Sequence, residues 1–124
     1  ETARADAAAA SLNQRYGAGR VSASADADAA LQGATGLIHA TPTGMDKLPG
    51  LPLPASLLHG GLWVSEIVYF PLDTALLRAA RERGCRVAGA RHRAPMARAR
   101  AVAWLCREAR DHRPPGGPAT AALQ

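Results

Sequence analysis

The chain has 124 residues, a mass of 12.9 kDa and a formal net charge of +5. This length suits one small domain and is too short for most enzymes with two domains. Aromatic residues make up only 4% of the chain, so its core must be built mainly from aliphatic side chains. No apolar run approaches the roughly 20 residues of a membrane span, which predicts a cytoplasmic protein without a membrane partner.

The positive charge is concentrated in the last third of the chain. Residues 1 to 85 carry seven Lys and Arg against eight Asp and Glu, whereas residues 86 to 124 carry eight Arg against two acidic residues. The two parts therefore have net charges of −1 and +6, which excludes a uniformly basic nucleic-acid binder. Cys85 and Cys106 lack the spacing of metal ligands, which predicts free thiols and no metal site.

The first third of the chain predicts two helices and two strands. Residues 2 to 16 are rich in Ala, Leu and Arg and are followed by a glycine, as expected of a capped helix. The alternation over residues 20 to 24 predicts a short strand, and residues 26 to 31 a short helix. The apolar run that follows predicts a buried strand that ends at Thr41.

The middle of the chain predicts a long loop, a strand, a helix and a further strand. Residues 42 to 60 hold four of the nine prolines, which indicates an irregular loop with one helical turn at 55 to 58. Residues 62 to 70 are β-branched and aromatic, as in a strand. Residues 73 to 83 predict a helix, and residues 85 to 88 a short strand. The apolar face of that helix comprises Leu76, Leu77 and Ala80.

This alternation of helices and strands predicts an α/β fold with a parallel sheet and crossover helices. Such a sheet binds ligands at the carboxyl ends of its strands. Those ends correspond to residues 41 to 45 and 69 to 71, so we expect the two loops to face one crevice.

Two polar side chains lie near the expected crevice. His39, near the end of the buried strand, either bonds a ligand group such as a ribose or an amide, or is satisfied by neighbouring backbone groups. Tyr69 ends the strongest strand, and its hydroxyl either reaches a ligand or belongs to the core. Gly17 and Gly19 do not form a dinucleotide fingerprint, because they follow a helix and precede a strand.

Beyond residue 88 the composition changes to Ala, Arg, Gly and Pro. Residues 95 to 110 predict a helix, and residues 113 to 124 are expected to be disordered. The arginines of the tail either neutralise phosphates or form a solvated basic segment. The absence of interleaved aromatic residues argues against nucleic acid as a partner. The arginines that would form this basic cluster are Arg91, Arg93, Arg98 and Arg100.

Two sequence motifs lie on either side of the proline-rich loop. Residues 39 to 45 read HATPTGM, and residues 64 to 85 read VSEIVYFPLDTALLRAARERGC, with PGLPLP at 49 to 54 between them. Their order and separation resemble the C-terminal domain of the shikimate dehydrogenase family, including its quinate/shikimate members. The resemblance covers residues 34 to 85 by motif and residues 1 to 33 by composition and element order. It implies a partial Rossmann-like sheet that lacks the first strand and the glycine-rich turn.

The resemblance also implies roles for five residues. Ala40, Thr41 and Pro42 would border the nicotinamide half of NADP or NAD. Ile67 would touch the nicotinamide through its backbone, and Tyr69 would contact the substrate, shikimate or quinate, from the cofactor side. The catalytic Lys and Asp of this family lie in a separate substrate domain, so no catalytic residue and no metal ligand is expected among these 124 residues.

The chain departs from the family pattern at several positions. The usual Asn of the first motif is His39, and the usual Asp of the second motif is Glu66. Lys47 matches no family motif and is not assigned as a base. Sequences of the family close with a G-x-G-M segment, and in this chain only Met96 matches that segment. The change in composition after Cys85 indicates either a reading-frame shift or a divergent tail.

We therefore expect a partial NAD(P)-binding domain at residues 1 to 88, a helical C-terminal segment at 89 to 112 and a disordered tail at 113 to 124. The expected function is that of the cofactor-domain part of a shikimate/quinate-type dehydrogenase, inactive as this chain alone. The alternatives are a small basic adaptor or nucleic-acid-binding protein that uses the Arg-rich tail, and a non-catalytic gene remnant. A sheet without its first strand would leave one edge uncovered, which predicts an oligomer.

Overall fold

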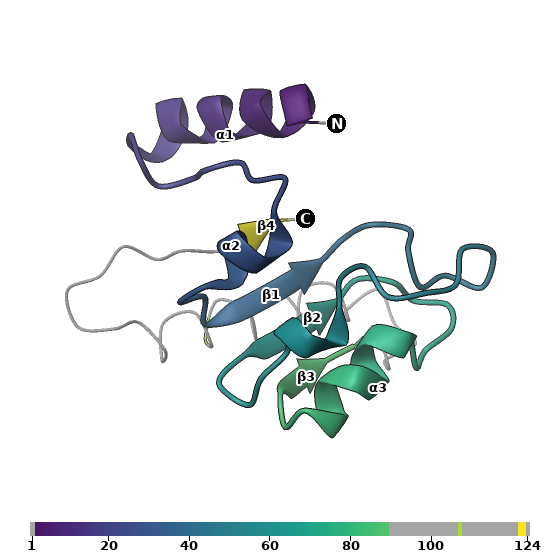
Figure 1. The fold of residues 1–124 in the computed structure, drawn as a ribbon. Coiled ribbons are helices and arrows are strands. Elements are labelled where there is room, and N and C mark those ends of the chain that lie inside the picture. The colour runs from purple at the N-terminus through teal and green to yellow at the C-terminus, as the bar shows by residue number, and fades with distance from the viewer. Residues whose placement is uncertain (1, 90–106, 108–121, 124) are drawn as a thin grey trace.

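The computed structural model describes residues 2–89, 107 and 122–123 (Figure 1). In chain order the elements are α1 (Thr2–Tyr16), α2 (Ala27–Leu31), β1 (Gly36–His39), the 3-10 turn η1 (Ala55–Leu57), β2 (Trp63–Glu66), α3 (Ala75–Glu82), β3 (Arg86–Ala88) and β4 (Ala122–Leu123). None of the helices in these described parts combines the length and the apolar character that a membrane crossing requires.

The sheet has the strand order β3-β2-β1-β4, and each neighbouring pair is parallel. In the central pair, Gly36 of β1 lies opposite Trp63 of β2, and His39 lies opposite Glu66. Helix α3 connects β2 to β3, as a crossover helix between parallel strands must. The predicted α/β fold with a parallel sheet is confirmed.

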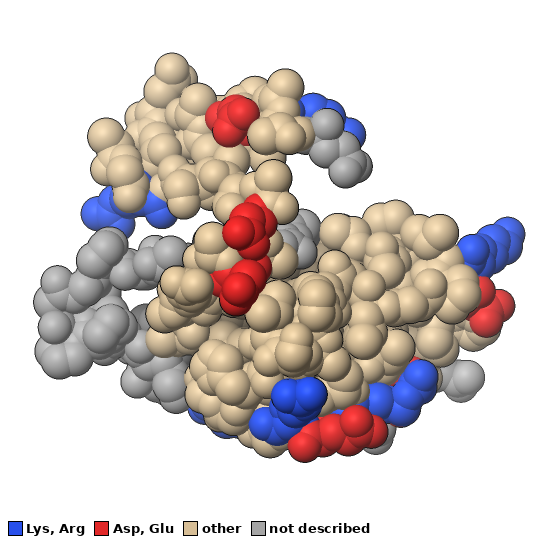
Figure 2. Space-filling view, viewed as in Figure 1, with Lys and Arg blue, Asp and Glu red and all other residues tan. Residues whose placement is uncertain are grey.

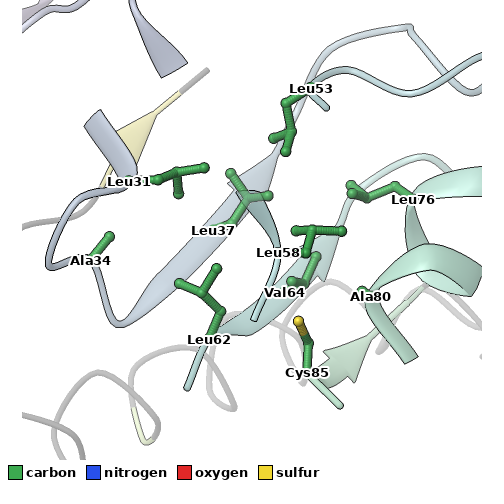
Figure 3. Packing of buried hydrophobic residues seen from close by; sticks show 10 residues of the cluster. All are labelled: Leu31, Ala34, Leu37, Leu53, Leu58, Leu62, Val64, Leu76, Ala80 and Cys85. Atoms are coloured by element: carbon green, nitrogen blue, oxygen red, sulfur yellow. The ribbon is translucent and has the colours of Figure 1, made fainter. Parts of the chain in front are cut away.

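The hydrophobic core lies between the sheet and the segments α2, η1 and α3. Figure 3 shows aliphatic side chains from β1 and β2 directed toward side chains of these segments. As the composition predicts, the core is mainly aliphatic, and Trp63 is the one buried aromatic residue among those that the structure describes. The residues of this cluster are Leu31, Ala34, Leu37, Leu53, Leu58, Leu62, Val64, Leu76, Ala80 and Cys85.

Helix α3 has clear signals at both ends and a buried apolar face. Thr74 is the N-cap residue, and its side-chain oxygen accepts a hydrogen bond from the backbone N–H of Leu77 at 3.2 Å. Gly84 follows the C-cap with a φ of +75°. The apolar face that the sequence predicts is buried, and it comprises Leu76, Leu77 and Ala80. The helix is shorter by two residues at its start and one at its end than the predicted range of 73 to 83.

Helix α1 matches its predicted range of residues 2 to 16. Ala9 is its one buried residue, and Figure 1 shows the helix set apart from the sheet. Asn13 ties the helix to the segment that follows it. The side-chain oxygen of Asn13 accepts hydrogen bonds from the backbone N–H groups of Arg20 and Val21, and its amide donates to the carbonyl of Val21 at 2.7 Å.

The predicted strand at residues 20 to 24 is wrong. These residues form no strand, because the side chain of Asn13 satisfies the backbone groups of Arg20 and Val21 that a neighbouring strand would otherwise bind. The short helix predicted after them is confirmed as α2, with Asp26 as its N-cap. The helical turn predicted within the proline-rich loop is confirmed as η1.

Strands β1 and β2 both end earlier than the sequence predicts. Strand β1 ends at His39 rather than at Thr41, and β2 ends at Glu66 rather than at residue 70. Their pairing stops at the same level, since His39 and Glu66 are opposite each other and β3 pairs with β2 only as far as Ser65. Beyond this level residues 67 to 70 have no paired neighbouring strand, so their β-branched and aromatic side chains alone do not continue the strand.

Most of the tail lies outside the described residues. This holds for the predicted helix at 95 to 110, apart from Arg107, and for the arginine cluster. Of the tail expected to be disordered, the structure describes two residues, Ala122 and Leu123, and here it differs from the prediction. They form β4 and pair with Leu37 and Ile38, which gives their backbone groups partners at the edge of β1.

Candidate functional site

The residues predicted from the family motifs lie at the carboxyl edge of the sheet. Ala40, Thr41 and Pro42 directly follow β1, and Ile67 directly follows β2. The backbone N–H of Ile67 donates to the carbonyl of His39 at 3.0 Å, so the two segments remain adjacent where the strands end. This is the edge at which parallel α/β sheets bind ligands.

Side chains at this edge are accessible to a ligand. Ile67 is 56% exposed and Tyr69 is 65% exposed. Ala40 and Pro42 are exposed as well, and Thr41 is half-buried. The exposure of Tyr69 excludes the alternative of a core tyrosine.

Large apolar side chains are exposed in both loops that follow these strands. In the loop after β1, Leu48 and Leu51 are exposed, and in the loop after β2, Phe70 and Leu72 accompany Ile67 and Tyr69. Figure 2 shows that the surface over the loop after β1 is largely uncharged, while charged side chains gather over α3, beside α2 and at the tip of the loop. Such a surface suits the apolar face of an aromatic ring better than a highly charged group.

Beneath this edge lies a buried network of polar side chains centred on Glu66. His39 and Glu66 are 1% and 3% exposed. Nδ1 of His39 lies 2.8 Å from Oε1 of Glu66, and Nε2 of His39 lies 2.6 Å from Oγ1 of Thr41. Oε1 of Glu66 also accepts the backbone N–H of Val68 at 3.1 Å, and Oε2 accepts the hydroxyl of Thr74 at 3.0 Å. The carboxylate thus serves as acceptor for donors from three segments.

This network joins the two strand ends to the start of α3. Thr74 accepts the N–H of Leu77 as the helix cap and donates to Glu66, so one hydroxyl serves both the helix and the strand. A carboxylate has only acceptor atoms, so with Glu66 in that form Nδ1 of His39 is the donor of their hydrogen bond. A buried charged group is tolerated only when its hydrogen bonds are satisfied, as they are here.

Neither of the two alternatives expected for His39, a hydrogen bond to a ligand or hydrogen bonds to the backbone, describes its contacts in the structure. Its ring is buried, and its two nitrogens lie within hydrogen-bonding distance of the side chains of Glu66 and Thr41 rather than of backbone groups. Sequence reasoning missed the contact between His39 and Glu66 and the part played by Thr74. A usable signal existed, since the two departures from the family motifs fall at the last residues of two adjacent strands.

The remaining candidates lie away from this edge or carry no site. Lys47 and His59 are exposed. The Cys85 thiol is buried and donates a hydrogen bond to the carbonyl of His59 at 3.2 Å, and burial raises the pKa of this thiol. Within the described part of the chain, no group of three or more His, Cys, Asp or Glu is arranged to hold a metal ion.

Comparison with known proteins places the chain among α/β proteins of Rossmann-like fold. A solved structure of quinate dehydrogenase from Corynebacterium glutamicum in complex with NAD matches it with a TM-score of 0.67 and 35% identity. The match covers 73% of this chain and 33% of that protein. The parallel sheet with its crossover helix is therefore the Rossmann-like sheet that the sequence predicts. A scan against models of known protein families gives no match.

Sequence relatives define the family more closely. The chain is 55% identical over 84 residues to shikimate dehydrogenase (NADP(+)) of Streptomyces avermitilis, covering 66% of this chain and 29% of that protein. It is 39% identical over 88 residues to quinate/shikimate dehydrogenase (NAD(+)) of Corynebacterium glutamicum, covering 68% and 31%. The curated homologues of this chain are thus shikimate and quinate/shikimate dehydrogenases, and the chain spans about a third of their length.

Proposed function

We propose that this chain is the cofactor-domain part of an NAD(P)-dependent shikimate/quinate-type dehydrogenase and that its carboxyl edge binds the nicotinamide half of the cofactor. The observation that carries the proposal is the exposure of Ile67, whose N–H binds the last residue of β1, and of Tyr69 two residues further along the chain. The resemblance to the family motifs implies that Ile67 would contact the cofactor and Tyr69 the substrate. When bound, the cofactor would supply the hydride donor or acceptor for a hydroxyl carbon of a cyclic polyol.

In this proposal the residues of the edge bind and orient, and they do not transfer protons. Ala40, Thr41 and Pro42 would border the nicotinamide half of the cofactor, and Ile67 would touch the nicotinamide through its backbone. The hydroxyl of Tyr69 would reach the substrate. The names of the relatives include both NADP(+) and NAD(+), so the proposal includes both cofactors.

Cofactor affinity of the chain alone is expected to be low. The 124 residues contain no G-x-G-x-x-G segment between a strand and a helix, and such a turn binds the pyrophosphate of a dinucleotide. We therefore expect no saturable binding of NAD or NADP at micromolar concentration by calorimetry. Millimolar NAD or NADP should instead shift the backbone NMR signals of Ala40, Thr41 and Ile67.

The opposite edge of the sheet provides the control for this titration. Gly60 and Gly84 lie close together there, near the amino ends of β2 and β3. Their signals should stay unchanged while those of the carboxyl edge move. A clear micromolar isotherm, or shifts confined to the amino edge, would contradict the proposed site.

Replacing Tyr69 is expected to lower kcat/KM for the substrate and to leave the KM of the cofactor nearly unchanged. The test is a chimera in which residues 34 to 85 replace the matching segment of the Streptomyces avermitilis enzyme. In it, Tyr69→Phe removes one hydroxyl hydrogen bond and keeps the exposed ring. Losing one neutral hydrogen bond lowers kcat/KM for shikimate or quinate by about two- to tenfold, with little change in the KM of the cofactor.

The exposed Phe70 supplies the matched comparison, because Phe70→Leu changes an aromatic side chain of the same loop without removing a hydroxyl. We expect it to change kcat/KM less than Tyr69→Phe does. Unchanged kinetics in Tyr69→Phe with a lowered Tm would show that the hydroxyl serves the fold.

A further inference from the structure

The hydrogen bond between Glu66 and Val68 determines the direction of the Ile67 carbonyl. Val68 donates its backbone N–H to Oε1 of Glu66, which is buried beneath the carboxyl edge. Among the described residues, the one cis peptide bond is Phe70–Pro71, so the bond between Ile67 and Val68 is trans. In a planar trans peptide the N–H and the C=O point in opposite directions. With the N–H turned toward the buried carboxylate, the Ile67 carbonyl is turned away from it.

The Glu66 side chain can hold this peptide in place because it is itself held from two sides. The side chains of His39 and Glu66 are 1% and 0% exposed, and their 2.8 Å contact fixes Oε1. The hydroxyl of Thr74 fixes Oε2 at 3.0 Å. A carboxylate with both oxygens engaged has little rotational freedom, and it presents Oε1 to Val68 in one orientation.

From this geometry we infer that Glu66, held by His39 and Thr74, is a positioning residue that orients the Ile67 carbonyl to accept a hydrogen bond from the carboxamide of a nicotinamide ring. The inference rests on the proposed function. The two positions at which the chain departs from its family motifs therefore contact each other and act on the backbone at one point of the site.

The experiment uses the full 124-residue chain and a label that reports one peptide bond. The sequence contains a single Ile–Val pair, at Ile67 and Val68, so protein labelled with carbonyl-¹³C isoleucine and ¹⁵N valine gives one correlated NMR signal. NAD and NADP are titrated separately to about 10 mM, a range suited to weak binding. The readout is the slope of the Ile67 carbonyl chemical shift against ligand concentration. Unfolded molecules do not contribute to this slope, so a partly unfolded variant does not change it.

The decisive variants are Glu66→Leu and Glu66→Gln. Leucine removes the acceptor of Val68, so the slope is expected to fall about two- to tenfold, the effect of misaligning one hydrogen bond. Glutamine retains a side-chain oxygen for Val68, and its NH₂ group can donate to Thr74, so its slope should stay close to that of the unmodified chain. Asp73→Asn, at an exposed carboxylate beside α3, is the control for loss of charge alone.

Each outcome has a distinct meaning. No response of the unmodified chain overturns the proposed function, and the inference with it. A normal response with an equal slope in Glu66→Leu overturns the inference alone, as does an equal loss in Glu66→Leu and Glu66→Gln, which would assign the effect to charge. If Glu66→Leu does not fold, Thr74→Val gives the answer, because it frees Oε2 and should lower the slope, and an unchanged slope would overturn the inference.

Discussion

A His39→Leu variant is expected to lose about 3 kcal/mol of its free energy of unfolding, because the carboxylate of Glu66 would stay buried without one of its donors. Leucine fills most of the space of the imidazole, so the loss reflects the polar contact more than a cavity. Urea unfolding followed by tryptophan fluorescence measures the change, and Trp63 is a buried reporter one strand away.

Two further variants separate the polar contact from a general effect of losing histidine. His59→Leu removes an exposed histidine and should change stability by about 0.5 kcal/mol or less. The double variant His39→Leu/Glu66→Gln removes the buried charge along with its partner and should recover part of the loss. Equal losses in the two single histidine variants would show that the buried pair contributes nothing specific.

Gly36→Ala is expected to destabilise the chain by about 3 kcal/mol, at the upper end of the usual cost of overpacking. A methyl group at this position would overlap the indole ring of Trp63, which lies opposite Gly36 in the paired strand. Because the ring is buried and protein interiors are closely packed, we expect it to have little room to move aside. Thermal unfolding by circular dichroism should show a lower Tm.

Gly60→Ala is the matched control, because a methyl group there meets only backbone atoms at 3.6 Å or more and the glycine has no positive φ. Its effect on the Tm should be small. Combining Gly36→Ala with Trp63→Leu should cost less than the sum of the two single changes, because the smaller side chain makes room for the methyl group. Additive losses in that double variant would mean that the ring and the methyl group do not collide.

Residue propensities and spacing within one segment were enough to predict the elements whose structure depends on that segment alone. The range of α1 follows from its helix-forming residues and the glycine after it, and the buried face of α3 follows from the spacing of its leucines. The parallel topology follows from the alternation of elements. The strand predicted at residues 20 to 24 failed because a side chain seven and eight residues earlier in the chain satisfies the backbone.

The ends of β1 and β2 and the buried network depended on contacts that a sequence pattern does not contain. Each strand ends where its neighbour ends, so neither end can be predicted from one strand alone. The sequence indicated which residues lie at the carboxyl edge, since both motifs follow predicted strands. It did not indicate that His39 and Glu66, 27 positions apart, are hydrogen-bonded partners.

The double use of the Thr74 hydroxyl constrains how this protein can vary. The same oxygen caps α3 and donates to Glu66 at the end of β2, eight positions earlier. Inserting or deleting a residue between them would move the helix relative to the strand, and one of these two hydrogen bonds would break. We therefore expect the connection from β2 to α3 to tolerate little change in its length.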